Sequence, residues 1–414
     1  MGRFARSRED GHEQRATTLE LFYDLVFVFA ITQVSHLLLD NLTFQGMGQA
    51  AIVLFVVWWA WNYTTWVTNE LDPDSPAVRL LLIGVMLASL FMAVAIPEAF
   101  GERGLLFAAS YVAIQVGRHT FLAFVAGDPG SLERARAARI LVWFVVAGAF
   151  WLAGGLADGS ERTAFWLAGI AIEVAGPFTV YWLPGRPRLP HSTWNVETTH
   201  FAERFQLFMI IALGETIVIT GATAAGLEID TPRVAAFAFA FLATAAMWWL
   251  YFTYVARIAE RRLAQAPVDE RTRLARDGYT YLHVVMVAGI IVAAVGDELV
   301  IAHPLDVLPG REVAVVVAGP ALYLLAHVLF RLRMARSLSW KRLGGALACV
   351  ALAPLGLVAP ALVLSALVVG VLVAVIALEE LAAARRRARG EPSPLERLEA
   401  PAQPAEAENV IPSV

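Results

Sequence analysis

The chain has 414 residues, of which 58% are hydrophobic and 16% are charged, and its mean hydropathy is +0.62. Soluble domains carry roughly 25% charged residues, so this composition excludes an ordinary soluble protein and predicts a membrane protein. The net charge is −4 and the basic residues lie in short clusters between apolar runs, which argues against nucleic acid as a partner. With Cys349 as its single cysteine, the chain has neither a disulfide framework nor a cysteine metal site.

Residues 1–17 are polar, and no small-residue cleavage site follows the first apolar segment. We therefore expect a cytoplasmic N-terminal segment before a retained membrane span, and not a signal peptide. A spanning helix needs about 20 mainly apolar residues. By that measure the sequence predicts an all-α polytopic membrane protein with about twelve spans, near 18–39, 47–68, 78–97, 104–126, 138–157, 163–183, 200–222, 233–256, 278–300, 312–332, 343–359 and 361–380.

The last two predicted spans adjoin each other. One helix over 343–380 would be about 57 Å long, too long for a single crossing. Pro360, with Gly356 before it, favours a tight hairpin there.

The basic residues predict how the twelve spans are oriented. Of the 32 Lys and Arg residues, 26 fall in the two termini and the even-numbered connections. By the positive-inside rule, both termini are then cytoplasmic, and the bacterial inner membrane is the expected location.

Several features recur at matching positions, which predicts an internal repeat. Residues 57–61 (Val-Trp-Trp-Ala-Trp) match residues 247–251 (Met-Trp-Trp-Leu-Tyr). We expect a first six-helix repeat over 18–185, a cytoplasmic linker over 186–199 and a second six-helix repeat over 200–380. Each repeat has an even number of crossings, so the halves share one orientation. The polar tail, 381–414, is predicted to be disordered.

Charged residues lie inside the first helix of each repeat. Glu20 and Asp24 are four residues apart and share a helix face, and His200, Glu203 and Arg204 share a face at the start of the seventh span. A charged side chain in hydrocarbon is costly, so its default interpretation is functional, with a partner nearby.

Three further charged residues lie within predicted spans. Glu215 and Glu173 are placed deep in the membrane, and Arg118 reaches the same predicted depth as Glu20 and Asp24. We predict that Arg118 pairs with Glu20 and Asp24. The predicted partner of Arg204 is either Glu203 or a carboxylate across the pseudo-symmetry axis.

Structural roles compete with these functional ones. Glu20 and Glu203 lie near helix starts, where carboxylates also serve as caps or anchors. Asp24, Glu173 and Glu215 either line a pathway or act as paired struts that fix helix packing. No metal-site, nucleophile or phosphate-loop motif occurs, so no cofactor, metal or catalytic residue is predicted.

The segments Glu20-Leu-Phe-Tyr-Asp24 and His200-Phe-Ala-Glu203-Arg204, with Gly214-Glu215 further along, resemble the bacterial low-temperature-requirement A family. The resemblance covers residues 15–380. It implies a polytopic inner-membrane protein named for a growth defect in the cold, and it brings no catalytic roles.

Three functions remain open at this point. The leading hypothesis is a non-enzymatic channel or secondary transporter for an ion, proton or small solute, with a carboxylate-lined path between the repeats. The alternatives are a non-catalytic membrane partner or sensor for growth in the cold, and an intramembrane enzyme acting on lipid. The expected partners are the lipid bilayer and, as a further possibility, a second copy of the chain.

Overall fold

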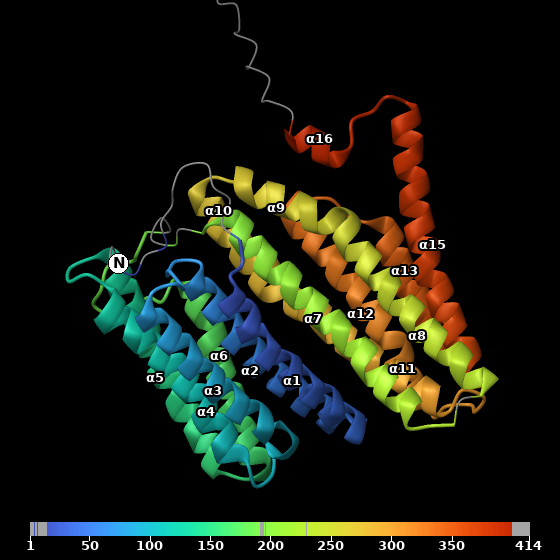
Figure 1. Cartoon of the computed structure of the whole chain (residues 1–414), viewed down its shortest axis with the longest axis horizontal. Coiled ribbons are helices and arrows are strands. Elements are labelled where there is room, and N and C mark those ends of the chain that lie inside the picture. Colours follow the sequence, from blue (N-terminus) through green and yellow to red (C-terminus); the bar gives the residue numbers. More distant parts are fainter. Residues whose placement is uncertain are drawn as a thin grey trace, which may run out of the picture.

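The computed structural model describes Phe4, Arg6, residues 15–190, Trp194, residues 196–228 and residues 230–399. Helices dominate these residues, and they contain no extended strand. Figure 1 shows two groups of helices that meet where α1 lies beside α7. Helices α1 and α7 begin, and α15 ends, at the same end of the bundle.

The first group contains six long helices in which most neighbours in sequence are neighbours in space. Helix α1 packs on α2 and α3, α3 packs on α4, α4 on α5, and α5 on α6. Local signals start several of these helices, because Thr17, Thr43 and Ser131 accept backbone N–H groups at their N-termini. The helices are α1 (Thr18–Asp40), α2 (Phe44–Thr68), α3 (Pro76–Ala95), α4 (Gly104–Phe121), α5 (Leu132–Leu156) and α6 (Gly159–Thr179).

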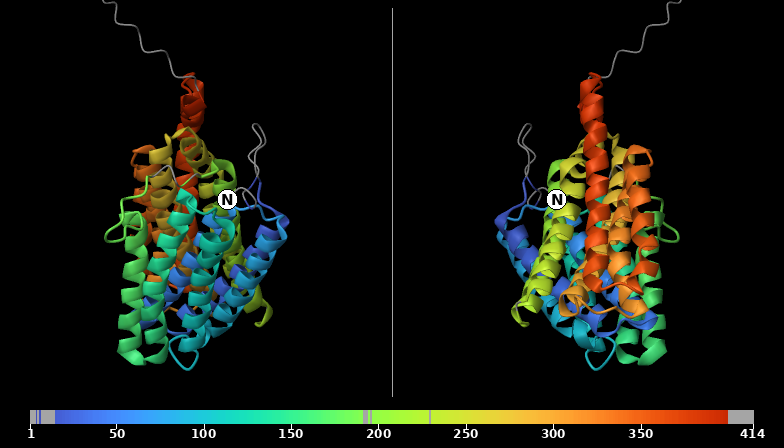
Figure 2. Two further views of the ribbon diagram at one scale, coloured as in Figure 1. Left: turned by 90° about the vertical axis from the view of Figure 1, so that its left-hand side faces the viewer. Right: turned by 90° about the vertical axis from the view of Figure 1, so that its right-hand side faces the viewer.

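The second group has a similar pattern of neighbours. Helix α7 packs on α8 and α11, α11 on α12, α12 on α13, and α13 on α15. Short helices flank the long ones, and the C-terminal helices project beyond the bundle (Figure 2). The helices are α7 (Thr198–Ala225), α8 (Thr231–Leu250), α9 (Ala256–Gln265), α10 (Val268–Leu274), α11 (His283–Ala302), α12 (Gly310–Ala335), α13 (Trp340–Ala351), α14 (Ala353–Gly356), α15 (Ala361–Ala388) and α16 (Pro394–Glu399).

Three helices continue through π-helical segments. Segment η2 (Leu122–Ala126) extends α4, η4 (Tyr251–Val255) joins α8 to α9, and η5 (Ala275–Leu282) joins α10 to α11. A π-helical turn leaves the regular bonding pattern and frees backbone groups for other partners. In η5, the carbonyl of Thr280 accepts the indole N–H of Trp58 from α2 at 2.7 Å.

Nine helices in the described residues are long and apolar enough to cross a membrane, whereas the sequence predicted about twelve spans. The predicted span near 343–359 differs most. Helix α13 has 12 residues and is therefore about 18 Å long, too short to cross alone, and α14 follows it after a break.

The C-terminal prediction needs correction. Disorder was expected from residue 381, but α15 continues to Ala388 and α16 occupies Pro394–Glu399. Residues 400–414 of the predicted tail lie outside the described residues.

Candidate functional site

Helices α1 and α7 are joined by two pairs of polar side chains that form a short ladder. Glu20 pairs with His200, and Asp24 pairs with Arg204. The partners of each pair are 180 residues apart, and on each helix the two members are one turn apart. Since the pairing keeps the same order on both helices, α1 and α7 run parallel, and the ladder connects the two groups of helices.

The Asp24–Arg204 pair is bidentate and as deeply buried as the Glu20–His200 pair. Both guanidinium NH2 groups of Arg204 donate to the Asp24 carboxylate at 2.7 Å, and Trp61 Nε1 donates to Oδ1 at 2.8 Å. Asp24 is 1% exposed and Arg204 is 0% exposed. A bidentate geometry of this kind is among the strongest charge-assisted contacts, and it offsets the cost of removing both ions from water.

The Glu20–His200 pair is fixed by an asparagine behind the imidazole ring. Asn69 Nδ2 lies 3.1 Å from His200 Nδ1 and 2.9 Å from the Glu197 carbonyl oxygen, and Asn69 Oδ1 accepts the Glu197 N–H. The amide therefore donates to Nδ1, which makes Nε2 the protonated nitrogen. Nε2 donates to Glu20 Oε1 at 2.9 Å.

Glu20 also caps its own helix, as the structural interpretation of the sequence expected. Its Oε2 accepts from the backbone and hydroxyl of Thr17, both at 2.9 Å, and from Arg6 at 3.2 Å. Thr17 and Glu20 thus form a capping box. Glu203 binds a different part of the chain: its Oε2 accepts the N–H of Ala16 at 2.7 Å. Of the two predicted partners of Arg204, Glu203 is wrong. The partner is Asp24, a carboxylate of the other helix group.

The predicted pairing of Arg118 with Glu20 and Asp24 is wrong. Arg118 donates to the Ala60 carbonyl at 3.1 Å, to Thr64 Oγ1 at 2.7 Å, and to the side-chain oxygen of Gln115. Arg118 shares the Ala60 carbonyl with the hydroxyl of Tyr23, next to Asp24, but its own bonds go to α2 and to Gln115 and not to the two carboxylates.

Arg118 reaches Glu173 through intermediates. Gln115 Nε2 donates to Tyr111 Oη at 2.9 Å, and the Tyr111 hydroxyl donates to Glu173 Oε2. Trp151 Nε1 donates to the other oxygen of Glu173 at 3.0 Å. These contacts make Glu173 a bonded strut within the first helix group, away from the α1–α7 interface.

Glu215 lies further along α7 than the ladder, and only one of its two carboxylate oxygens has a hydrogen-bond partner. Its Oε2 accepts from Thr32 Oγ1 at 2.6 Å across the α1–α7 interface. Its Oε1 is buried without a hydrogen-bond partner, and the residue is 1% exposed. A half-satisfied carboxylate in a buried interface is costly, which marks Glu215 as a functional candidate.

Further acidic groups lie toward the far end of α11. Asp297 Oδ2 and Glu298 Oε2 are buried without partners. Glu298 lies close to Thr223 of α7 and to His36 of α1. Thr32 and Glu298 therefore extend the set of polar groups along the surface where α1, α7 and α11 meet.

Three residues of the site were not predicted from the sequence, namely Thr32, Trp61 and Asn69. Thr32 follows Asp24 by eight residues on α1, close to two helical turns, and this spacing was an available signal. Trp61 and Asn69 carry no comparable signal, because their role depends on how α2 is placed against α7. Among the described residues, no group of three His, Cys, Asp or Glu side chains is arranged to hold a metal ion.

An all-helical bundle with apolar helices of spanning length and charged groups buried between them defines a polytopic membrane protein. The family described as Bacterial low temperature requirement A protein (LtrA) matches residues 15–377, and the chain belongs to this family. It is 37% identical over 342 residues to an uncharacterized protein of Rhizobium meliloti (strain 1021), with 82% of each chain covered. No solved structure matches the chain.

Proposed function

We propose that the protein is a channel or secondary transporter of the bacterial inner membrane that moves a proton, an ion or a small solute along the α1–α7 interface. The observation that carries this proposal is the buried carboxylate of Glu215, whose Oε1 has no partner. A purely structural carboxylate at this depth is expected to be fully bonded, as Asp24 and Glu173 are. An open bonding position suits a group that exchanges a proton or contacts a cation.

The hydroxyl of Thr32 suits proton exchange at Glu215. It lies 2.6 Å from Glu215 Oε2 and 3.1 Å from the Val28 carbonyl oxygen, and both contacts are oriented to receive a proton from the hydroxyl. A hydroxyl has one proton to donate. When Glu215 is ionised, that proton goes to the carboxylate. When Glu215 is protonated, the acid can donate to Thr32 and the hydroxyl can donate to Val28, so both states are bonded.

The surroundings of Glu215 differ between its two sides. Toward the far end, the polar residues Glu298, Thr223 and His36 follow. Toward the ladder, Phe27 and Phe208 are 0% and 1% exposed and lie between Asp24–Arg204 and Glu215 along the two helices. The interface is thus polar on one side of Glu215 and apolar on the other, as expected of a pathway closed at the ladder end.

In this proposal the ladder is a strut and not part of the conducting path. Its four side chains are bonded to each other and to Trp61, Asn69 and Thr17, with Arg204 Nε as the remaining buried nitrogen without a partner. It holds the two helix groups together at one end of the α1–α7 interface. Relative movement of the two helices is then expected nearer the other end, around Glu215.

An arginine contacts equivalent backbone positions in the two helix groups, although it comes from helices that are not equivalent. Arg118 of α4 donates to the Ala60 carbonyl at 3.1 Å, and Arg342 of α13, a helix placed like α5, donates to the Leu250 carbonyl at 3.0 Å. Ala60 and Leu250 occupy equivalent positions of the two Trp-Trp segments. The similar order of helix neighbours favours two six-helix repeats of the same orientation. The distribution of basic residues favours cytoplasmic termini.

Flux in proteoliposomes tests the proposal. Purified protein is reconstituted, and ion and proton fluxes are recorded under an ion gradient and after a pH jump, for wild type, Glu215→Gln and Glu228→Gln. Glu228 is an exposed carboxylate beyond the end of α7, so its variant is matched in charge change. We expect flux from wild type and Glu228→Gln, and a loss of at least about tenfold in Glu215→Gln, since removal of an essential proton-transfer group has effects of 10²–10⁴.

Equal flux from wild type and Glu215→Gln would remove Glu215 from the pathway. Flux from none of the three proteins, with all three correctly folded, would favour a non-catalytic partner or sensor, which needs only the scaffold.

A further inference from the structure

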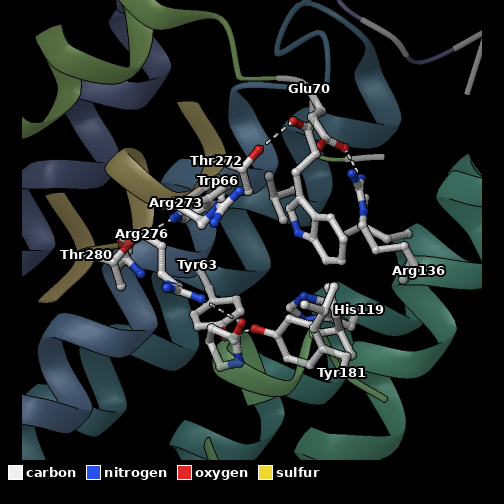
Figure 3. A pocket seen from close by; sticks show the side chains of 18 residues that line it. Tyr63, Trp66, Glu70, His119, Arg136, Tyr181, Thr272, Arg273, Arg276 and Thr280 are labelled. Carbon is white, nitrogen blue, oxygen red and sulfur yellow. Dashed lines mark hydrogen bonds and ion pairs between the residues drawn. The ribbon is translucent and has the colours of Figure 1, made fainter. Parts of the chain in front are cut away.

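A separate cavity of about 80 Å³ lies between the two helix groups (Figure 3). Its wall comes from α2, α4, α5 and the segment after α6 on one side, and from α10 and η5 on the other. A water molecule needs about 10–15 Å³ of such space, so the cavity has room for several waters or one small chemical group. No residue predicted as a pathway group lines it.

The charged lining of the cavity is mainly basic. Arg136, Arg273 and Arg276 line it together with Glu70 as the one acidic residue. Arg136 forms an ion pair with Glu70. Arg276 pairs through Nε with Asp277 at 2.6 Å and donates to the Pro177 carbonyl at 3.2 Å, whereas the Nε of Arg273 donates to a backbone carbonyl, that of Asp269. The positive charge of this wall therefore comes mainly from Arg273, which lies beside Arg276 near the aromatic rings (Figure 3).

A buried amide adds a hydrogen-bond donor to the wall. Asn62 is 1% exposed, and its Nδ2 has no partner. The side-chain amide cannot be flipped without losing a hydrogen bond. Asn62 Oδ1 accepts from Thr280 Oγ1 at 3.1 Å, and that hydroxyl accepts from Trp66 Nε1 at 3.1 Å. A buried donor without a partner costs about 1–3 kcal/mol, which a bound acceptor would recover.

Aromatic rings form much of the remaining wall. Trp66, His119 and Trp194 line the cavity, as do Tyr63 and Tyr181, whose hydroxyls bond to each other. The Arg136 guanidinium lies 5.6 Å from the centre of the Trp194 ring. Such a wall suits an apolar body, while the arginines and the Asn62 amide suit an acceptor with negative charge.

We propose that this cavity binds an oxyanion, a phosphate or carboxylate, that is attached to an apolar or aromatic body. The oxyanion accepts from Arg273, Arg276 and Asn62, and the body packs against Trp66 and the paired tyrosines. Arginine is suited to this role because its planar group donates two parallel hydrogen bonds to such anions. The site is independent of the proposed transport through Glu215 and would exist in a protein without flux.

Two sources share this chemistry, namely a water-soluble aromatic acid and the head group of an anionic lipid. The probe is phenyl phosphate, with benzyl alcohol as its neutral counterpart, titrated into the purified full-length protein by calorimetry. The variants are Arg273→Gln, Arg273→Gln with Arg276→Gln, and Arg257→Gln. Arg257 is an exposed arginine of α9 outside the lining, which makes it the matched control.

We expect saturable binding of phenyl phosphate to wild type, weakened about tenfold or more by the double variant and changed less than about twofold by Arg257→Gln. Binding should weaken with added salt, because the attraction is partly electrostatic. Equal binding of benzyl alcohol, an equal loss in Arg257→Gln, or no saturable binding of phenyl phosphate would overturn the proposal.

Nanodiscs identify the source. Phenyl phosphate is titrated into protein in phosphatidylcholine alone and in phosphatidylcholine with phosphatidylglycerol. Weaker binding with phosphatidylglycerol assigns the site to a lipid head group, and unchanged binding assigns it to a soluble acid; both support the oxyanion site.

Discussion

Asp24→Asn and Arg204→Gln are each expected to lower the free energy of unfolding by about 3–5 kcal/mol. Each substitution leaves the other ion buried without its charge partner, because both residues are at most 1% exposed. The loss of stability comes mainly from the remaining unpaired charge in the interior, and less from the lost attraction between Asp24 and Arg204. Thermal unfolding in detergent, followed by circular dichroism, measures it.

The double variant, Asp24→Asn with Arg204→Gln, is expected to be more stable than either single variant. Neither position of the pair then carries a charge, and two amides can still form a hydrogen bond at the same place. Asp74→Asn is the matched control, since Asp74 pairs with Arg79 at 2.7 Å and is 80% exposed at its side chain. That change should cost less than about 1 kcal/mol. Additive losses in the double variant would show that the two residues do not act as a pair.

Gly289→Ala is expected to lower the free energy of unfolding by about 1–3 kcal/mol. A Cβ on Gly289 would lie 2.7 Å from the backbone N and 2.9 Å from the Cα of Tyr323, so α11 and α12 must move apart. Small residues allow this close approach in membrane bundles, where packing between helices supplies much of the stability. The midpoint of thermal unfolding is the measurement.

Gly370→Ala provides the control for that experiment. A Cβ on Gly370, within α15, would meet nothing within 4 Å. Replacing a helical glycine where there is space should stabilise the protein by about 0.4–1 kcal/mol. If both variants behave alike, the α11–α12 contact is not as close as described.

The sequence predicted which helices carry charge more reliably than which charges meet. The four-residue spacing of Glu20 and Asp24, and of His200 and Arg204, correctly put each pair on one face. Depth follows from the rise of 1.5 Å per residue, so the level of Arg118 could also be predicted. The direction of its side chain could not, because that depends on which helix lies beside α4.

The two Trp-Trp segments show how tertiary placement overrides sequence similarity. Trp58 and Trp59 are each 1% exposed, whereas Trp248 and Trp249 are 46% and 44% exposed. Helix α2 lies among its neighbours and α8 lies at the periphery (Figure 1).

The π-helical segments were not predicted from the sequence. The π-helical segment η5 has no composition signal, yet it places Thr280 against Trp58 and Trp66 and Arg276 in the cavity wall. The cavity could not be predicted either, because Asn62 and Arg273 come from different helix groups and their approach depends on the whole fold.

Infrared difference spectroscopy after a pH jump asks most directly whether Glu215 takes up and releases a proton from water. For reconstituted wild type and for Glu228→Gln, we predict a carbonyl band of a protonated carboxylic acid that declines as the pH is raised, and its absence in Glu215→Gln. Superposable difference spectra for wild type and Glu215→Gln would show that no proton reaches this carboxylate, and would contradict a pathway along α1 and α7.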